Sequence, residues 1–231
     1  MSTFVHRYEL DTSRPTVKQA ARDAAMRVLL PAVALWAALV GVGFLIVGPL
    51  NDLPAGNPVE QWFADHRTPT MNTVSEWVGR LGMTEVVIGV TVLTVALVWW
   101  RTRQWWFAAV PALAVSVQSL VFITASALVT RERPDVKHLD EAPPTSSFPS
   151  GHTGASTALW FTLALLAQRI THPVLRAVVT VVCVLIPFAV AVSRLYRGMH
   201  GPADVTFGLV NGAVCVVLAW GYLRRSTPER R

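Results

Sequence analysis

The chain has 231 residues, of which 52% are hydrophobic and 15% are charged, and its formal net charge is +6 at pH 7. Soluble domains carry about 25% charged residues, so this composition excludes an ordinary soluble domain and indicates a membrane protein. Nucleic-acid binding would require a soluble basic domain. The sequence shows no such domain, which argues against a nucleic-acid partner.

The start of the chain is polar, and no small-residue cleavage site follows its first apolar run, so we expect no cleavable signal peptide. We expect residues 1–25 to form a cytoplasmic N-terminal segment, residues 26–223 a single membrane domain and residues 224–231 a cytoplasmic tail. Cys183 and Cys215 both lie in apolar runs and are interpreted as small core residues.

Six apolar runs approach the length of about 20 residues that a helix needs to cross a bilayer. They cover approximately residues 26–47, 85–100, 105–129, 153–168, 175–192 and 205–223. The sequence therefore predicts an all-α fold, a six-transmembrane helical bundle. Pro31, Pro111 and Pro187 lie inside these runs, where prolines are tolerated near helix starts or as kinks.

The connection between the first two runs, residues 48–84, is long and opens with the turn-forming sequence GPLNDLPAGNP. Its remainder has apolar residues at helical spacing, including Trp62, Phe63, Trp77 and Val78. We expect this part to form amphipathic helices that lie at the membrane surface.

The distribution of basic residues predicts the orientation in the membrane. Of the 20 Lys and Arg residues, 13 fall in the two ends of the chain and the loops on their side, and 7 fall on the opposite side. Because basic residues remain cytoplasmic, both termini are predicted to be cytoplasmic. The loops after the first, third and fifth runs then face outward.

His200 and Asp204 are four residues apart at the start of the sixth run. If Gly201 and Pro202 open a helix, both side chains lie on one face of its first turn. The carboxylate then accepts the Nδ1 proton of His200 and leaves Nε2 free for nucleophilic attack. The alternative is a plain helix start that Asp204 caps.

The sequence PSGH, residues 149–152, stands where a loop enters the fourth run. Backbone N–H groups around Ser150 and Gly151 can bind phosphate oxygens there, with the Ser150 hydroxyl as a further donor. His152 is then placed to protonate a leaving oxygen. The alternative is a Ser150 helix cap beside a solvated histidine.

Arg133 and Arg194 each stand at the outer end of an apolar run. A guanidinium group binds phosphate with two parallel hydrogen bonds. The alternative is an interfacial side chain that reaches from the hydrocarbon to water. We prefer phosphate binding, because both arginines share one membrane face with the two histidine motifs.

These motifs resemble the signature of the type 2 phosphatidic acid phosphatase superfamily, which is K-x6-RP, then PSGH, then SR-x5-H-x3-D. The resemblance covers approximately residues 58–220, and ADHRTPTMNTVSEWVGRLG also looks like the first outer loop of bacterial members. The matching positions are Arg133-Pro134, Pro149-Ser150-Gly151-His152, Ser193-Arg194, His200 and Asp204.

One position departs from the family pattern. The family's lysine, seven residues before the arginine of the first motif, is replaced here by Ser126. The nearest substitute for this lysine is Arg131, which we take as a further phosphate ligand. We therefore expect Arg131→Ala to reduce activity far more than Arg197→Ala.

The resemblance implies a covalent mechanism with no cofactor and no metal ion. His200 attacks phosphorus and forms a phosphohistidine, Asp204 holds His200, and His152 protonates the leaving group and later activates water. The phosphate oxygens are held by Arg133, Arg194, Ser150 and Gly151. The nearby residues Asp135, His138, Asp140 and Glu141 lack the spacing of a known metal motif.

The sequence thus predicts a multi-pass cell-membrane phosphatase of the cell envelope that removes a phosphate monoester or pyrophosphate from a lipid. An outward site favours polyprenyl pyrophosphate, with phosphatidic acid and phosphatidylglycerol phosphate as alternatives. Its expected partners are the lipid substrate and the membrane, without nucleic acid or an obligate protein partner. Two rival functions are a lipid phosphotransferase that uses the same phosphohistidine and a non-enzymatic transporter or lipid-binding protein.

Overall fold

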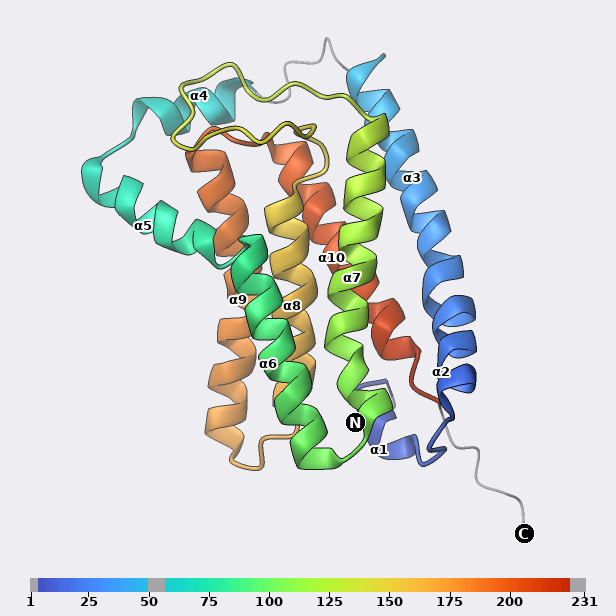
Figure 1. Ribbon diagram of the computed structural model, residues 1–231. Helices are drawn as coiled ribbons and strands as arrows, with labels where there is room; N and C mark the ends of the chain where they lie inside the picture. The colour runs from blue at the N-terminus through green and yellow to red at the C-terminus, as the bar shows by residue number, and fades with distance from the viewer. Residues whose placement is uncertain (1–3, 50–56, 225–231) are drawn as a thin grey trace.

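The computed structural model describes residues 4–49 and 57–224, and within these ranges the chain forms helices and loops without strands. Long helices run side by side as one bundle (Figure 1). The loop that joins α7 (Trp105–Leu128) to α8 (Gly151–Ala167) covers one end of the bundle, and the end of α10 (Pro202–Gly221) lies at the other. The predicted all-α fold is confirmed.

The remaining helices are, in chain order, α1 (Arg7–Leu10), α2 (Val17–Ala24), a π-helical turn (Ala25–Leu29), α3 (Leu30–Val47), α4 (Asn57–Asp65), α5 (Pro69–Arg80), α6 (Thr84–Thr102) and α9 (Pro173–Tyr196). Within the described ranges, five helices are long and apolar enough to cross a membrane: Val17–Val47, α6, α7, α9 and α10. They correspond to five of the six predicted runs. The predicted fourth run forms α8, which has 17 residues, and the count of six spans stays a prediction.

The first long helix begins at Val17, well before the predicted start at residue 26. Thr16 and Gln19 form a capping box, in which each side chain accepts a hydrogen bond from the other residue's backbone N–H. This cap satisfies the free N–H groups of a polar first turn, so the helix starts before its hydrophobic part does. The domain boundary expected between residues 25 and 26 therefore falls inside a helix.

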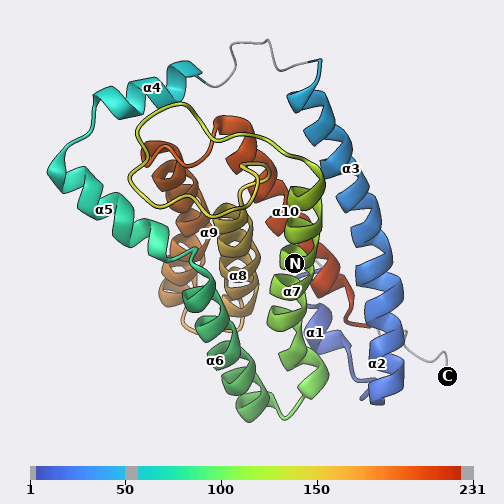
Figure 2. The ribbon, with the colours of Figure 1, turned by 45° about the horizontal axis from the view of Figure 1, so that its top comes forward.

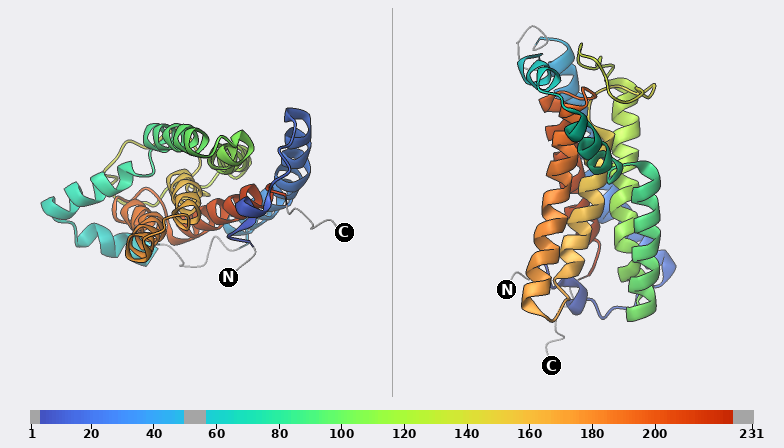
Figure 3. Two further views of the ribbon diagram at one scale, coloured as in Figure 1. Left: turned by 90° about the horizontal axis from the view of Figure 1, so that it is seen from below. Right: turned by 90° about the vertical axis from the view of Figure 1, so that its left-hand side faces the viewer.

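Helix α8 lies in the middle of the bundle and packs against α7, α9 and α10 (Figure 3, left). Its contact with α10 is unusually close, because glycines face each other there. A Cβ atom added to Gly212 would come within 2.5 Å of the Gly154 carbonyl oxygen, and one added to Gly208 within 2.7 Å of the Ser150 carbonyl oxygen. Small residues let membrane helices approach this closely, and here they bring the PSGH motif beside the start of α10.

The predicted amphipathic segment forms α4 and α5, which pack against α9 and project outward from the bundle (Figure 2). Trp62 on α4 and Trp77 on α5 are more than half exposed. Their position at a membrane surface stays a prediction. The turn-rich opening of this loop (50–56) and the end of the predicted tail (225–231) lie outside the described residues.

The N-terminal segment packs beneath the bundle at the end opposite the α7–α8 loop. The ring of Tyr8 stacks on Phe107 at 3.9 Å between centroids. The indole N–H of the buried Trp220 donates a hydrogen bond to the Phe4 carbonyl oxygen at 2.8 Å. These contacts fix both described ends of the chain at the same end of the bundle.

We expect Gly212→Ala to destabilise the protein, because the new methyl group would meet the backbone of α8. Overpacking of this kind costs about 1–3 kcal/mol, which thermal unfolding in detergent would detect as a lower melting temperature. Gly89→Ala on α6 is the matched control, because nothing lies within 4 Å of its added Cβ. An equal or higher melting temperature for Gly212→Ala would contradict the close α8–α10 contact.

Candidate active site

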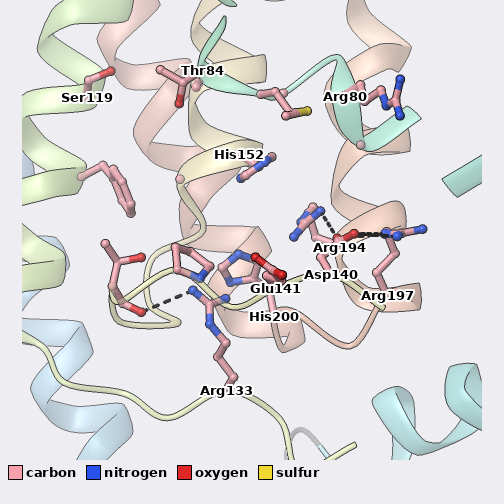
Figure 4. Close-up of a pocket in the computed structure, with 18 of the residues that line it drawn as sticks. Arg80, Thr84, Ser119, Arg133, Asp140, Glu141, His152, Arg194, Arg197 and His200 are labelled. Carbon is pink, nitrogen blue, oxygen red and sulfur yellow. Dashed lines mark hydrogen bonds and ion pairs between the residues drawn. The ribbon is translucent and has the colours of Figure 1, made fainter. Parts of the chain in front are cut away.

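A cavity of about 970 Å³ opens at the end of the bundle covered by the α7–α8 loop, which spans residues 129–150. Five residues that the sequence predicts to form the site line it: Arg133, Gly151, His152, Arg194 and His200. Figure 4 shows the two histidine rings facing the same space, with Arg194 beside them and Arg133 approaching His200 from the loop. Two helices and two loops therefore bring the three motifs together.

Ser150 does not line the cavity, because its hydroxyl caps α8. It is fully buried, and its Oγ atom accepts a hydrogen bond from the Thr153 N–H at 3.4 Å and lies 3.0 Å from Thr153 Oγ1. Of the two roles that the sequence leaves open for the Ser150 hydroxyl, phosphate binding or a helix cap, the structure shows the helix cap. The backbone at Gly151, which starts α8, remains at the cavity wall.

His200 is held by a backbone carbonyl and not by the carboxylate expected from the sequence. Its Nδ1 atom lies 2.8 Å from the Ser147 carbonyl oxygen and 3.9 Å from Asp204 Oδ2, which is beyond hydrogen-bond distance. A carbonyl can only accept, so Nδ1 carries the proton and Nε2 keeps its lone pair. The expected nucleophilic tautomer is therefore present, with a different partner.

Asp204 is 1% exposed, and its carboxylate accepts hydrogen bonds from Ser147 Oγ at 2.6 Å and from the Gly201 N–H at 2.8 Å. It also forms an ion pair with Arg131. These three donors occupy the carboxylate, which explains why it does not reach the imidazole. Asp204 instead holds Ser147, whose carbonyl holds His200.

Arg131 was expected to contribute to a phosphate site, but its guanidinium pairs with Asp204, and it is not among the residues that line the cavity. Ser126, at the position of the family's lysine, is buried on α7, and its hydroxyl donates to the Ile123 carbonyl oxygen at 3.1 Å. The further positive charge at the cavity comes from Arg197, which the sequence led us to expect to matter less than Arg131. The available signal was its spacing of three residues from Arg194, which places both on one helix face.

Asp140 joins the two arginines at the end of α9. It accepts a hydrogen bond from Arg194 Nη1 at 2.9 Å, and Arg197 donates to both of its oxygens at 2.5–2.9 Å. Burial favours a raised pKa for Asp140, but the hydrogen bonds and charges of Arg197 and Arg194 outweigh it and lower the pKa. Asp140 therefore stays a carboxylate, with both guanidinium groups fixed at the cavity wall.

The cavity is suited to an anion. Its basic lining residues outnumber its acidic ones: Arg80, Arg133, Arg194 and Arg197 against Glu76, Asp140 and Glu141. The Nε atom of Arg194 is buried and has no hydrogen-bond partner within the described part of the chain. A free guanidinium donor beside two further buried or half-buried arginines is the arrangement that binds phosphate oxygens.

The pKa of His200 is held well below its ordinary value, first by burial and then by the positive charges of Arg194 and Arg133. Both causes disfavour the protonated ring. His200 is therefore neutral near pH 7, which is the form in which a histidine acts as a nucleophile.

Comparison with known proteins agrees with these motifs. The sequence model of the PAP2 superfamily matches residues 108–228. Decaprenylphosphoryl-5-phosphoribose phosphatase from two strains of Mycobacterium tuberculosis is 34% identical to this chain over 116 residues. That match covers 49% of this chain and 58% of the relative, so the chain spans less than two thirds of the relative's length.

Two solved structures have a similar fold. The first transmembrane PAP2 type phosphatidylglycerolphosphate phosphatase from Bacillus subtilis superposes with a TM-score of 0.73 at 22% identity, over 86% of this chain and 98% of the other. The corresponding values for LpxE from Aquifex aeolicus are 0.59 and 19%, over 73% of this chain and 96% of the other. At these identities the likeness concerns the fold.

We expect the His200 ring to remain neutral as the pH is lowered through 6.5, because burial and two arginines oppose its protonation. Histidine NMR across this range, with His200→Gln to assign the signal, measures the titration directly. The unfolded chain takes up a proton at this position near pH 6.5, so His200 makes the folded protein less stable as the pH falls below about 6.5. Titration of His200 near pH 6.5 would contradict its buried, arginine-flanked setting.

Proposed function

This chain belongs to the PAP2 superfamily, and on that basis we propose that it is a membrane phosphatase that removes phosphate from a lipid through a covalent phosphohistidine. One observation carries the proposal. The neutral, buried His200 has its Nδ1 proton bound to the Ser147 carbonyl oxygen, beside a cavity whose wall carries fixed arginines. A lone pair on Nε2 and a phosphate-binding wall are the two requirements for attack on phosphorus.

In the first step, Nε2 of His200 attacks the phosphorus atom of the lipid phosphate. The new P–N bond forms as the P–O bond to the leaving group breaks, and His152 gives its proton to the leaving oxygen. The negative charge of the bound phosphate favours the protonated form of His152, which otherwise stands among positive groups. The product of this step is the free lipid alcohol and phosphorylated His200.

In the second step, His152 takes a proton from water, and the resulting hydroxide attacks the phosphohistidine. The P–N bond breaks, inorganic phosphate leaves and His200 returns to its neutral form. In both steps, the charge that develops on the equatorial oxygens is stabilised by Arg133, Arg194 and the Gly151 N–H.

Because arginines supply the positive charge that stabilises these oxygens, the reaction needs no metal ion, and activity should persist in the presence of a chelator.

Asp204 acts indirectly in this proposal. It accepts hydrogen bonds from the N–H of Gly201, the residue after the nucleophile, and from the hydroxyl of Ser147, whose carbonyl oxygen bonds to His200. Arg131 neutralises the buried carboxylate and is a positioning residue. We therefore revise the role of Arg131 from phosphate ligand to support of Asp204.

The cavity suits a lipid, because its wall contains apolar residues that face outward from the bundle. Ile88 on α6 is 53% exposed and Ile123 on α7 is 59% exposed, and both line the cavity. A hydrocarbon chain can leave the cavity between these helices and enter the surrounding membrane. The relative named decaprenylphosphoryl-5-phosphoribose phosphatase supports a polyprenyl lipid as the substrate. Pyrophosphate, the form favoured by the sequence, remains one candidate headgroup.

We place the cavity on the outer side of the cell membrane and both termini in the cytoplasm. The cavity and the described ends of the chain lie at opposite ends of the bundle. In the sequence, 13 of the 20 Lys and Arg residues belong to the two ends of the chain and the loops predicted on their side. Both facts agree with the positive-inside rule.

Release of inorganic phosphate from a panel of polyprenyl and glycerol lipids tests the function. We expect wild-type protein to release phosphate and His200→Ala to lose at least about 10³-fold in rate. The matched control is His138→Ala, since this histidine bonds to the Pro134 carbonyl oxygen and does not line the cavity. Absence of release from every lipid would refute the phosphatase, and transfer of phosphate to an added alcohol in preference to water would indicate a phosphotransferase.

Inhibition by orthovanadate separates ligands from positioning residues. We expect Arg194→Ala to weaken inhibition by about tenfold or more, because a charged hydrogen bond to the anion is lost. Arg131→Ala should lower kcat through Asp204 and leave the inhibition constant nearly unchanged. An equal loss of inhibition in both variants would show that Arg131 binds the phosphate after all.

A further inference from the structure

Glu60 is a buried acidic residue that does not line the cavity and has no role in the proposed mechanism. It lies in the first turn of α4, where a carboxylate is favourable beside the free N–H groups of the helix. A carboxylate at the surface would serve that purpose equally well. Glu60 is instead 2% exposed, and its Oε2 atom has no hydrogen-bond partner within the described ranges. Because burial of an unpaired polar atom is unfavourable, the helix start does not explain its position.

The carboxyl group of Glu60 lies against Gly201, the residue that follows His200 in the α9–α10 loop (197–201). A Cβ atom added to Gly201 would come within 2.8 Å of Glu60 Oε1 and within 3.6 Å of Asp204 Oδ2. The backbone does not require a glycine there, because a φ of −87° is open to any residue. The glycine therefore serves to leave room for the Glu60 carboxyl group.

Helix α4 is attached to the neighbouring end of α9. The rings of Phe63 and Tyr196 meet edge to face, with 6.1 Å between their centroids. Arg67, which follows the helix, donates to the Tyr196 carbonyl oxygen at 3.0 and 3.2 Å and to the Lys137 carbonyl oxygen at 2.6 Å. These contacts keep Glu60 at the α9–α10 loop.

Glu60 also faces Arg131 and Asp204, which are already paired with each other. Burial raises the pKa of Glu60. The hydrogen bond from its own backbone N–H and the charge of Arg131 oppose this effect, and the charge of Asp204 adds to it, so that the pKa is raised overall. A carboxyl group in such a place binds its proton more readily, so we expect the shape of the side chain to matter more than its charge.

We propose that Glu60 is a positioning residue for the nucleophile, because its carboxyl group packs against Gly201 and so keeps His200 directed at the phosphate-binding wall. Glu60 acts through Gly201 and is not among the residues that line the cavity. It should therefore affect the rate of the chemical step and not the binding of phosphate. This inference rests on the proposed phosphatase function and adds α4 to the elements that support its site.

Kinetics of Glu60 variants test the inference on the lipid that wild-type protein hydrolyses fastest. We expect Glu60→Ala to lower kcat by about tenfold or more, since small displacements of a reacting group are costly, and to leave the inhibition constant of orthovanadate nearly unchanged. Glu60→Gln keeps the shape of the side chain without its charge and should retain most of the activity.

Gln61→Ala is the matched control on the same helix, because this exposed side chain donates to Asp65 of α4 and is not near the site. A kcat in Glu60→Ala equal to that of the control would overturn the inference. A loss in Glu60→Gln as large as that in Glu60→Ala would also overturn it, since the amide keeps the contact with Gly201.

Gly201→Ala separates positioning from a general loss of structure. We expect this change to lower kcat when Glu60 is present, because the new methyl group would displace the Glu60 carboxyl. In Glu60→Ala that carboxyl group is absent, so the addition of Gly201→Ala should cause little further loss. Losses that simply add in the double variant would contradict the contact between the two residues and overturn the inference.

The NMR signal of the His200 ring gives a measurement that does not depend on catalysis. We expect Glu60→Ala to shift this signal and Gln61→Ala to leave it in place. An unchanged His200 signal in Glu60→Ala would overturn the inference. Failure of wild-type protein to hydrolyse any lipid would instead refute the proposed function, and the two failures are therefore distinguishable.

Discussion

The buried carboxylate of Asp204 is the group on which the site depends. It lies at the start of α10, where water cannot satisfy it, so it must take its hydrogen bonds from the protein. Its donors come from Ser147, Gly201 and Arg131, which lie in two separate loops. The hydrogen bonds to the Asp204 carboxylate therefore connect the α7–α8 loop to the α9–α10 loop. They also hold Ser147, whose carbonyl oxygen bonds to His200.

The close packing of α8 on α10 makes this arrangement possible. Glycines at the contact bring the backbones together, and the Ser150 N–H donates to the Asp204 carbonyl oxygen at 2.9 Å. The PSGH turn and the start of α10 thus form one rigid unit. In the proposed mechanism, this unit keeps the nucleophile and the acid in a constant relation to the bound phosphate, which catalysis by positioning requires.

The wall of the cavity carries paired charges. Asp140 forms ion pairs with Arg194 and Arg197 and partly neutralises their charge. On the other side of His152, Ser119, Thr84 and Arg80 contribute to the lining (Figure 4).

The sequence by itself determined the helical class, the approximate helix ranges and the residues of the two histidine motifs, because hydrophobic runs, caps and motif spacing are local properties. It placed His152, His200, Arg133 and Arg194 together correctly. Only the tertiary structure decided that Ser147, 53 residues away in the chain, holds His200, that Asp140 binds Arg197, and that Arg131 supports Asp204. These contacts join irregular loops that have no periodic pattern, and each depends on which buried charge the folded chain must satisfy.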